Sequence, residues 1–382
     1  MRRPVIGIIG AGQLALMMAE ASERLDVDIA VLGAGPEDPA LRLASRSVIG
    51  DHLDRDTMLA FAAEVDVVTF DHELVDVDLV AELERSGHAV RPGSTALAVA
   101  VDKRAQYEAF LTTEIPMPRS IVAQGSEELR AAIDAIGLPL VIKHARGGYD
   151  GRGVTMIEDP ADIQPSRLVE LLGDLDVTFV VQDAVAIDSE IAVQVVRSVS
   201  GEVAAYPVVR TVQEQGICRM VQIPAAIDEQ LAEQATASAM RLAEHLDVVG
   251  ILAVEFFVSG GQLLVNEIAA RPHNSGHITI ESSATSQFEN HLRAVAGFPL
   301  GSTDLVVNAA SMVNVIGIDL TERAGDPPSI EVPADAAVHL YGKSHRPGRK
   351  LGHVTAVGDS LDDVTRRARR AAEALELQGA TR

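Results

Sequence analysis

Cysteine, tryptophan and positive charge are all scarce in this chain of 382 residues. Its single cysteine, Cys218, excludes an intrachain disulfide and a cysteine-based zinc site, and fits a reducing, cytoplasmic setting. Aromatic residues make up only 3% of the chain, which argues against a surface that stacks nucleobases. The formal net charge of −23 disfavours general binding to nucleic acid or to anionic membranes. An anionic ligand would therefore need its own local cluster of Lys and Arg.

Long apolar runs are also missing. No stretch reaches the ~18–20 apolar residues that cross a membrane. The segment 5–18 imitates the core of a secretory signal, but glycines at 7, 10 and 12 interrupt it. The length suggests two or three domains, and 47% hydrophobic with 23% charged residues is ordinary for a packed protein.

The first 95 residues alternate strand patterns with helical patterns. Strands are expected at 5–9, 29–32, 47–49 and 65–70. This order predicts an open parallel sheet with helices on both faces. The last strand runs into Asp71-His72-Glu73, at the edge where such sheets bind ligands.

The turn after the first strand, Gly10-x-Gly12-x-x-Ala15, imitates a dinucleotide-binding fingerprint. A nicotinamide cofactor would want an acid at the end of the second strand, and none follows Leu32. We therefore favour glycines that let strand and helix pack closely. A third interpretation is a helix N-terminus that binds another anion, such as a phosphate.

A glycine-rich segment follows a strand that ends on Lys143. It reads Gly147-Gly148-Tyr149-Asp150-Gly151-Arg152-Gly153 and precedes a strand at 154–157. Four glycines let backbone N–H groups approach a phosphate closely. The segment is not a Walker A loop, because Gly-Lys-Ser/Thr and a following helix are absent. A phosphate-binding loop is favoured over a flexible turn. Helices are expected at 95–112, 223–245 and 364–377.

Two later strands, at 253–258 and 263–268, each carry one glutamate among apolar residues. If the turn between the strands has an odd number of residues, Glu255 and Glu267 face each other and repel unless a cation lies between them. Mg²⁺ is commonly held by one or two carboxylates plus substrate phosphates. The alternative, two solvated glutamates on an edge, is opposed by their apolar neighbours.

A polar run, Asn266 to His277, continues the second of these strands. His273 and His277 have the spacing of helical zinc ligands, but no Glu follows the first and Ser275-Gly276 weakens a helix. Zinc is therefore disfavoured. Arg271 beside a metal-bound nucleotide is better interpreted as a clamp on the charge that develops in phosphoryl transfer.

Together these motifs resemble the N5-carboxyaminoimidazole ribonucleotide synthetase family of ATP-grasp enzymes, also called the ATPase subunit of phosphoribosylaminoimidazole carboxylase. The likeness rests on the lysine strand, the glycine-rich segment, the glutamate pair and Arg-Pro-His-Asn-Ser-Gly-His at 271–277. It extends from Gly7-x-x-Gly10-x-Gly12-Gln13-Leu14 to Tyr341-Gly342-Lys343 and Arg346-Pro347-Gly348-Arg349-Lys350. It therefore covers essentially the whole chain.

The resemblance implies a fold of mixed α/β and α+β type. Its parts are an N-terminal open parallel α/β domain at 1–95, a two-lobed ATP-grasp unit at 96–330 with its smaller lobe at about 119–185, and a small C-terminal β-rich domain with a final helix at 331–382. The implied enzyme is an ATP-dependent carbon–nitrogen ligase of purine biosynthesis. Bicarbonate and ATP form carboxyphosphate, which carboxylates 5-aminoimidazole ribonucleotide and leaves ADP and phosphate. A homodimer and a transient contact with the downstream mutase are also implied.

The resemblance also implies roles for individual residues. The ATP-binding residues would be Lys103, Lys143, Gly148, Gly151, Arg152, Gly153, Gln182, Asp183, Ala184, Val185, Glu190, Gln213 and Asn266. Glu255 and Glu267 would hold Mg²⁺, and Arg271, Asp150 and Tyr149 would be catalytic. The substrate-binding residues would be Tyr149, Asp150, Arg152, Arg271, His273, Asn274, Lys343, Arg349 and Lys350.

Some positions depart from the family pattern. The hinge at 182–185 reads Gln-Asp-Ala-Val where the family usually has Glu-Gly-Phe-Val, and the motif after the fourth strand reads Phe70-Asp71-His72-Glu73-Leu74. Ala269 stands where many other ATP-grasp enzymes have an Asn metal ligand, which leaves two carboxylates to carry the metal.

Three rival interpretations stay open. One is another ATP-grasp ligase, such as a formate-dependent glycinamide ribonucleotide transformylase or a biotin carboxylase. The second is an NAD-dependent oxidoreductase, which the missing acid after Leu32 opposes. The third is a non-catalytic nucleotide-binding module, which has little need of the transfer arginine, Arg271.

Overall fold

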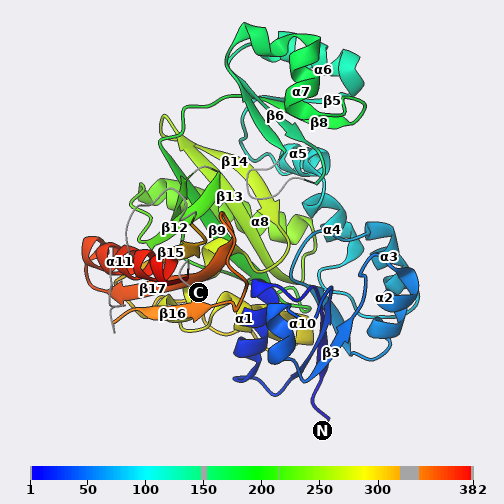
Figure 1. Cartoon of the computed structure of the whole chain (residues 1–382), viewed down its shortest axis with the longest axis vertical. Coiled ribbons are helices and arrows are strands. Elements are labelled where there is room, and N and C mark those ends of the chain that lie inside the picture. Colours follow the sequence, from blue (N-terminus) through cyan, green and yellow to red (C-terminus); the bar gives the residue numbers. More distant parts are fainter. Residues whose placement is uncertain (1, 148–152, 215, 319–334, 380–382) are drawn as a thin grey trace.

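The structure is a computed structural model that describes residues 2–147, 153–214, 216–318 and 335–379. Within these residues three sheets form the framework, and a small lobe projects from the larger body (Figure 1). No helix in the described ranges is long and apolar enough to cross a membrane.

The N-terminal sheet confirms the predicted parallel arrangement. Its strands are β1 (Val5–Ile9), β2 (Asp28–Gly33), β3 (Arg46–Ile49) and β4 (Val67–Phe70), in the order β3-β2-β1-β4. The connecting elements are α1 (Gln13–Ser22), the short helix η1 (Pro39–Arg42), α2 (Arg55–Ala62) and α3 (Val77–Arg85). Ile6 and Ile8 pack with α1, while Ile9 packs with α2 and α3, so helices cover both faces.

Two helices, rather than the expected single one at 95–112, lead out of this sheet. They are α4 (Ser94–Ala100) and α5 (Lys103–Thr112). The helical conformation is interrupted at Asp102, whose side chain accepts the N–H of Arg104 at 2.9 Å and caps α5. This break places Lys103 at the first position of a new helix.

The small lobe is an antiparallel sheet backed by helices. Its strands are β5 (Ser120–Gln124), β6 (Leu140–His144), β7 (Val154–Ile157) and β8 (Thr178–Asp183), in the order β5-β8-β6-β7. The helices are α6 (Gly125–Ile136), η2 (Pro160–Ile163) and α7 (Pro165–Leu172). Leu129, Leu140, Leu168 and Phe179 are buried in the core between the sheet and these helices.

The third sheet has nine strands and runs on into the C-terminal segment. In the order β14-β13-β9-β11-β12-β15-β17-β16, with β10 paired to β9, it links strands far apart in sequence. The bounds are β9 (Ser189–Arg197), β10 (Val203–Ala205), β11 (Val209–Glu214), β12 (Ile217–Ile223), β13 (Gly250–Ser259), β14 (Gln262–Ala269), β15 (Ala309–Ile316), β16 (Ala337–Leu340) and β17 (Lys350–Gly358).

The helices on this sheet differ from expectation at their ends. α8 spans Glu229–His245 rather than 223–245, because residues up to Ile223 form a strand and Asp228 caps the helix by accepting the N–H of Gln230. The last helix, α11 (Leu361–Gly379), is longer than predicted. The remaining helices are η3 (Asn274–Gly276), α9 (Thr279–Ser282) and α10 (Gln287–Ala296).

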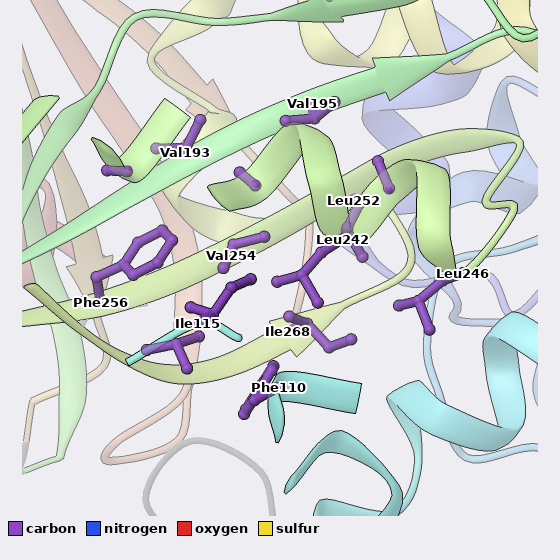
Figure 2. Close-up of a cluster of buried hydrophobic side chains, with 14 of the residues drawn as sticks. Phe110, Ile115, Val193, Val195, Leu242, Leu246, Leu252, Val254, Phe256 and Ile268 are labelled. Carbon is purple, nitrogen blue, oxygen red and sulfur yellow. The ribbon is translucent and has the colours of Figure 1, made fainter. Parts of the chain in front are cut away.

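The core under α8 fixes the strands that carry the glutamates. Leu242 of α8 and Leu246, which caps its C-terminus, pack against Leu252 and Val254 of β13 (Figure 2). Ile268, next to Glu267, belongs to the same cluster. Each such side chain contributes about 1.5–3 kcal/mol when fully buried. The carboxylates are therefore attached to a rigid platform.

Candidate active site

The large sheet places the two predicted glutamates opposite each other on neighbouring strands. Glu255 on β13 and Glu267 on β14 are direct partners in the antiparallel ladder. Burial, together with the negative charges of Glu267 and Glu190, raises the pKa of Glu255. Lys103 lowers the pKa of Glu267. Two adjacent carboxylates repel each other, and a bound cation would stabilise both in their charged form.

Two lysines supply part of that positive charge. Lys103 places its Nζ 2.5 Å from Oε2 of Glu267. Lys143, at the end of β6 in the small lobe, donates from Nζ to Oδ1 of Asn266 at 2.9 Å. Burial and the charge of Lys103 lower the pKa of Lys143 to about 8. The two lobes thus face each other across these four residues.

A small pocket joins this charged centre to the predicted adenine hinge. Its lining includes Lys103, Lys143, Asn266 and Gln182. Gln182 donates from Nε2 to Oγ of Ser120 at 2.9 Å. The structure therefore brings one end of the predicted hinge next to the predicted phosphate-binding lysines.

The rest of the hinge is tied to neighbouring segments. The N–H of Asp183 donates to the carbonyl of Arg119 at 2.9 Å, and that of Ala184 to the carbonyl of Pro139 at 3.2 Å. Val185 follows and is half-buried. The predicted adenine contacts of these residues stay predictions.

Glu190 and Gln213 lie together on adjacent strands, as the predicted nucleotide site requires. Glu190 is on β9 and Gln213 on the neighbouring strand β11. Burial raises the pKa of Glu190 and the charge of Glu267 adds to the rise, whereas the nearby Gln213 side chain opposes it. Glu190 therefore belongs to the same carboxylate cluster as Glu255 and Glu267.

Part of the predicted phosphate loop lies outside the described residues. This applies to Gly148, Tyr149, Asp150, Gly151 and Arg152, so their predicted roles toward ATP and substrate stay predictions. Gly153 is described, and its carbonyl accepts the N–H of His144 at 2.9 Å. Val154, the residue after Gly153, pairs with Lys143 across β6 and β7.

Arg271 connects the large sheet to the N-terminal domain. Its Nη2 lies 3.1 Å from Oε2 of Glu73, and the N–H of Ala270 donates to Oε1 of the same carboxyl at 3.0 Å. The predicted site did not include Glu73 or Asp71. Their position just after β4, at the carboxyl end of a parallel strand, was the signal that could have added them.

Asp71 also explains why the first domain's glycine turn is not a dinucleotide site. Its Oδ2 accepts the N–H of Gly12 at 2.6 Å, at the N-terminus of α1. A Cβ on Gly10 would lie 1.7 Å from Oδ1 of Asp71. The chain's own carboxylate thus occupies the place of a pyrophosphate. Burial raises the pKa of Asp71 to about 6, although Arg271 and Lys343 oppose the rise.

The predicted cationic cluster lies against this end of the N-terminal domain. Lys343 donates from Nζ to Oε1 of Gln13 on α1. Burial and the charges of Arg349 and Lys350 lower the pKa of Lys343 to about 8, against the opposing effect of Asp71. The structure therefore brings three predicted phosphate-binding cations together. Their position next to Gln13 and Asp71 is information that the sequence did not provide.

The polar run after β14 separates its two histidines. His273 places Nε2 3.6 Å from Oε1 of Glu255, whereas the ring of His277 stacks on His353 at 4.4 Å. Among the described residues, no three His, Cys, Asp or Glu side chains are placed to hold a metal ion. His273 and His277 therefore contact different partners.

Asn274 follows His273 in the polar run and begins η3. Its side chain is buried, and neither Nδ2 nor Oδ1 has a nitrogen or oxygen partner in the described chain. Cys218 is next to it, and burial raises the pKa of that thiol to about 12. The negative charge of Glu255 adds to this rise, whereas the positive charge of Lys350 and the Asn274 side chain oppose it.

Comparison with known proteins first defines a class. Sequence models of three families match the chain: the ribonucleotide synthetase preATP-grasp domain at 3–101, the ATP-grasp domain at 108–288 and the phosphoribosylaminoimidazole carboxylase C-terminal domain at 310–367. With the two-lobed cleft, these matches identify an ATP-grasp protein.

Individual relatives then define the family. The N5-carboxyaminoimidazole ribonucleotide synthase of Mycobacterium bovis is 42% identical over 97% of this chain and 87% of its own length. The crystal structure of the Thermus thermophilus enzyme has a TM-score of 0.86 at 38% identity, covering 97% and 98% of the two chains. That of the Aspergillus clavatus enzyme, with ADP and 5-aminoimidazole ribonucleotide, has a TM-score of 0.86 at 29% identity, covering 98% and 99%. The chain belongs to the N5-carboxyaminoimidazole ribonucleotide synthase family.

Proposed function

We propose that this protein carboxylates 5-aminoimidazole ribonucleotide with bicarbonate at the expense of ATP. A bicarbonate oxygen attacks the γ-phosphorus of ATP, which releases ADP and forms carboxyphosphate. The amine nitrogen of the ribonucleotide then bonds to the carboxyl carbon, phosphate leaves, and N5-carboxyaminoimidazole ribonucleotide results. One observation carries the proposal: the opposed carboxylates of Glu255 and Glu267 lie beside Lys103 and Lys143, and Arg271 from the same polar run pairs with Glu73 of the N-terminal domain.

The donor set at the glutamate pair fits Mg²⁺. Glu255 and Glu267 are opposed hard oxygen donors, and their mutual repulsion shows in the raised pKa of Glu255. These two residues would hold the ion together with phosphate oxygens of ATP. When bound, Mg²⁺ neutralises charge on the transferring phosphoryl group.

The chain's own cations act on the same phosphates. Lys103 and Lys143 converge on the glutamate pair from α5 and from the small lobe, and bind the phosphates of ATP. Asn266 holds the Nζ of Lys143, and Glu190 with Gln213 contacts the nucleoside. Arg271, steadied by Glu73, stabilises negative charge on carboxyphosphate.

The ribonucleotide occupies the end of the cleft nearest the N-terminal domain. Lys343, Arg349 and Lys350 bind its 5′-phosphate, because three cations close together favour a bound anion. His273, which lies beside Glu255, and its neighbour Asn274 bind the reacting groups. The roles of Tyr149, Asp150 and Arg152 rest on the resemblance alone.

Several other predictions accompany this proposal. We expect a homodimer, transient contact with the downstream mutase and a cytoplasmic location. We also keep the division at about 95 and 330, although β15 pairs with both β12 and β17 within one sheet. Size-exclusion chromatography with light scattering would measure the oligomeric state.

The direct test is release of ADP from purified protein with Mg-ATP and bicarbonate, with and without 5-aminoimidazole ribonucleotide. We expect release to depend on both bicarbonate and the ribonucleotide. Dependence on formate with glycinamide ribonucleotide, or on biotin, would instead favour the other ATP-grasp ligases. Nucleotide binding without any release would favour a non-catalytic module.

A further inference from the structure

A backbone hydrogen bond to the ring of His273 determines which ring nitrogen carries the proton. The N–H of Ser275 donates to Nδ1 of His273 at 3.3 Å, so His273 caps the short helix η3. A backbone N–H can only donate. Nδ1 must therefore present its lone pair, and the ring proton of the neutral imidazole belongs on Nε2.

A second contact depends on this result. Oγ of Ser275 lies 2.8 Å from the same Nδ1. Because Nδ1 carries no proton, the serine hydroxyl must donate its hydrogen there. Its oxygen is then left to accept a hydrogen bond from elsewhere.

Gln194 supplies that hydrogen. It lies on β9, is fully buried, and places Nε2 2.7 Å from Oγ of Ser275. With the amide reversed, the serine hydroxyl would have to donate to Gln194, and its oxygen would then face the lone pair of Nδ1. The backbone N–H of Ser275 thus sets the direction of the whole chain, from Gln194 through Ser275 to His273.

Another buried glutamine holds the backbone of His273. Oε1 of Gln287 accepts the N–H of His273 at 3.0 Å, and Nε2 donates to its carbonyl at 2.6 Å. A Cβ at Gly276 would lie 2.1 Å from Oε1 of Gln287, so this approach requires glycine. The ring can therefore neither shift with its backbone nor exchange its tautomer without breaking buried hydrogen bonds.

We propose that Gln194 and Ser275 are positioning residues that lock His273 in the tautomer with its proton on Nε2. That atom faces Oε1 of Glu255 at 3.6 Å. His273 then presents a donor to the Glu255 carboxylate and to an anionic ligand. It cannot ligate a metal through Nε2, because that atom has no lone pair in this tautomer. Only the consequence for turnover rests on the proposed function.

The tautomer itself can be measured without substrates. Protein labelled with ¹⁵N-histidine gives two ring nitrogen signals for each histidine, and His273→Asn assigns the pair from His273. We expect a protonated Nε2 and an unprotonated Nδ1 in the wild type. Ser275→Ala should shift both signals toward the other tautomer, and Gln194→Met should shift them in the same direction by less. The reverse tautomer in the wild type, or unchanged signals in Ser275→Ala, overturns the proposal.

Kinetics then test the consequence. Loss of a side chain that orients a group beside a metal ligand typically costs roughly 10- to 100-fold in activity. We expect Ser275→Ala to lower kcat for ADP release within this range and to leave KM for ATP nearly unchanged. Ser311→Ala is the matched control, because Ser311 is fully buried and its hydroxyl has no partner in the described chain. Equal losses in both variants, with an unchanged tautomer, would mean that Ser275 acts only through folding.

If Ser275→Ala does not fold, the ring nitrogen signals and the kinetics are both measured on Gln194→Met instead. If the wild type releases no ADP with any substrate, the proposed function fails, while the ring nitrogen signals still decide the tautomer. The two claims are therefore separable.

Discussion

At the scale of single residues, the cleft is a balance of opposite charges held close together. Glu267 pairs with Lys103, and Glu255 lies opposite it with a raised pKa. At 4 Å and an effective dielectric of 20, one pair of unit charges interacts by about 4 kcal/mol. Removal of one member therefore changes the charge that reaches the nucleotide phosphates.

Glu267→Gln should nearly abolish turnover and leave the fold intact. The amide keeps the size of the side chain but loses the charge, so metal-assisted neutralisation worth several kcal/mol disappears. ADP release across a range of Mg²⁺ concentrations measures the effect, with circular dichroism to confirm folding. Glu233→Gln, at an exposed position on α8, is the control. Ordinary Mg²⁺-dependent ADP release by folded Glu267→Gln would reject the assignment of this residue as a metal ligand.

At the scale of secondary-structure elements, the turn between β16 and β17 carries the cationic cluster. The backbone of this turn is tied down, because the N–H of Gly348 donates to the carbonyl of Gly317 and the N–H of Gly317 to the carbonyl of Arg349, both at 2.8 Å. Arg349 also donates to Oγ of Ser344 at 2.8 Å. Hydrogen bonds within the protein therefore fix the backbone of this turn and the side chain of Arg349.

Lys350→Ala should raise KM for the ribonucleotide far more than KM for ATP. One charged phosphate contact is worth about 1.5–3 kcal/mol, or roughly 10- to 150-fold. Coupled ADP release at saturating bicarbonate gives both constants, and Arg370→Ala on the exposed face of α11 is the control. A larger change in KM for ATP would assign Lys350 to the nucleotide. No change in either would assign the cluster to a solvated surface.

How much the sequence could predict also differs between elements. Local patterns were enough for the parallel N-terminal strands. They did not determine the pairing of Glu255 with Glu267, because the short turn pairs Ser259 with Gln262 and a register shift next to Glu255 then brings Glu267 opposite it. They failed at Asp102, where a helix cap outweighs continuous helical periodicity. They could not place Glu73 on Arg271, since that ion pair joins residues 198 positions apart.

At the scale of the whole molecule, three units share one hydrophobic core. Phe288, Leu292 and Val295 of α10 pack with Ile6 of β1, and Tyr341 from the C-terminal segment joins them. This shared core keeps Asp71 of the N-terminal unit near Lys343 of the C-terminal segment. Mutations in it should therefore affect stability before they affect chemistry.

His291 joins the N-terminal sheet to the large sheet within this region. Its Nδ1 accepts the N–H of Ile251 at 3.1 Å, so Nε2 carries the proton and donates to Oγ1 of Thr69 at 2.7 Å. Thr69→Val leaves that donor buried without a partner and should lower the free energy of unfolding by about 1–3 kcal/mol. Urea unfolding measures it, with Thr69→Ser, which keeps the hydroxyl, as the control. Greater destabilisation by serine than by valine would contradict the role of this hydrogen bond.

A stack of three imidazoles lies where the C-terminal strands meet the polar run. His353 stacks between His277 at 4.4 Å and His339 at 4.5 Å, and Oη of Tyr341 lies 2.8 Å from Nδ1 of His353. His339 pairs with Glu281 at 2.7 Å, and this partner raises its pKa despite burial. Burial, with the charges of neighbouring histidines, keeps the pKa of His277 and of His353 well below the ordinary value. Of the three rings, His339 is therefore the one whose surroundings favour protonation.

This arrangement predicts that acid weakens the fold through His353. In the unfolded chain its pKa is about 6.5, so the unfolded state binds a proton below that pH while the folded state does not. Stability from this group is complete above pH 6.5 and falls as pH drops toward the folded pKa, by about 1.4 kcal/mol per pH unit. Other groups titrate in the same range, including His339 and the carboxyl of Asp71 with the opposite sign.

The comparison of wild type with His353→Gln isolates the contribution of His353. Urea unfolding between pH 8 and pH 5 should show a slope smaller by nearly one proton in the variant, while exposed His245→Gln keeps the wild-type slope. Parallel pH profiles for wild type and His353→Gln would mean that His353 takes up its proton equally in both states, and the buried stack would then not make the fold sensitive to acid.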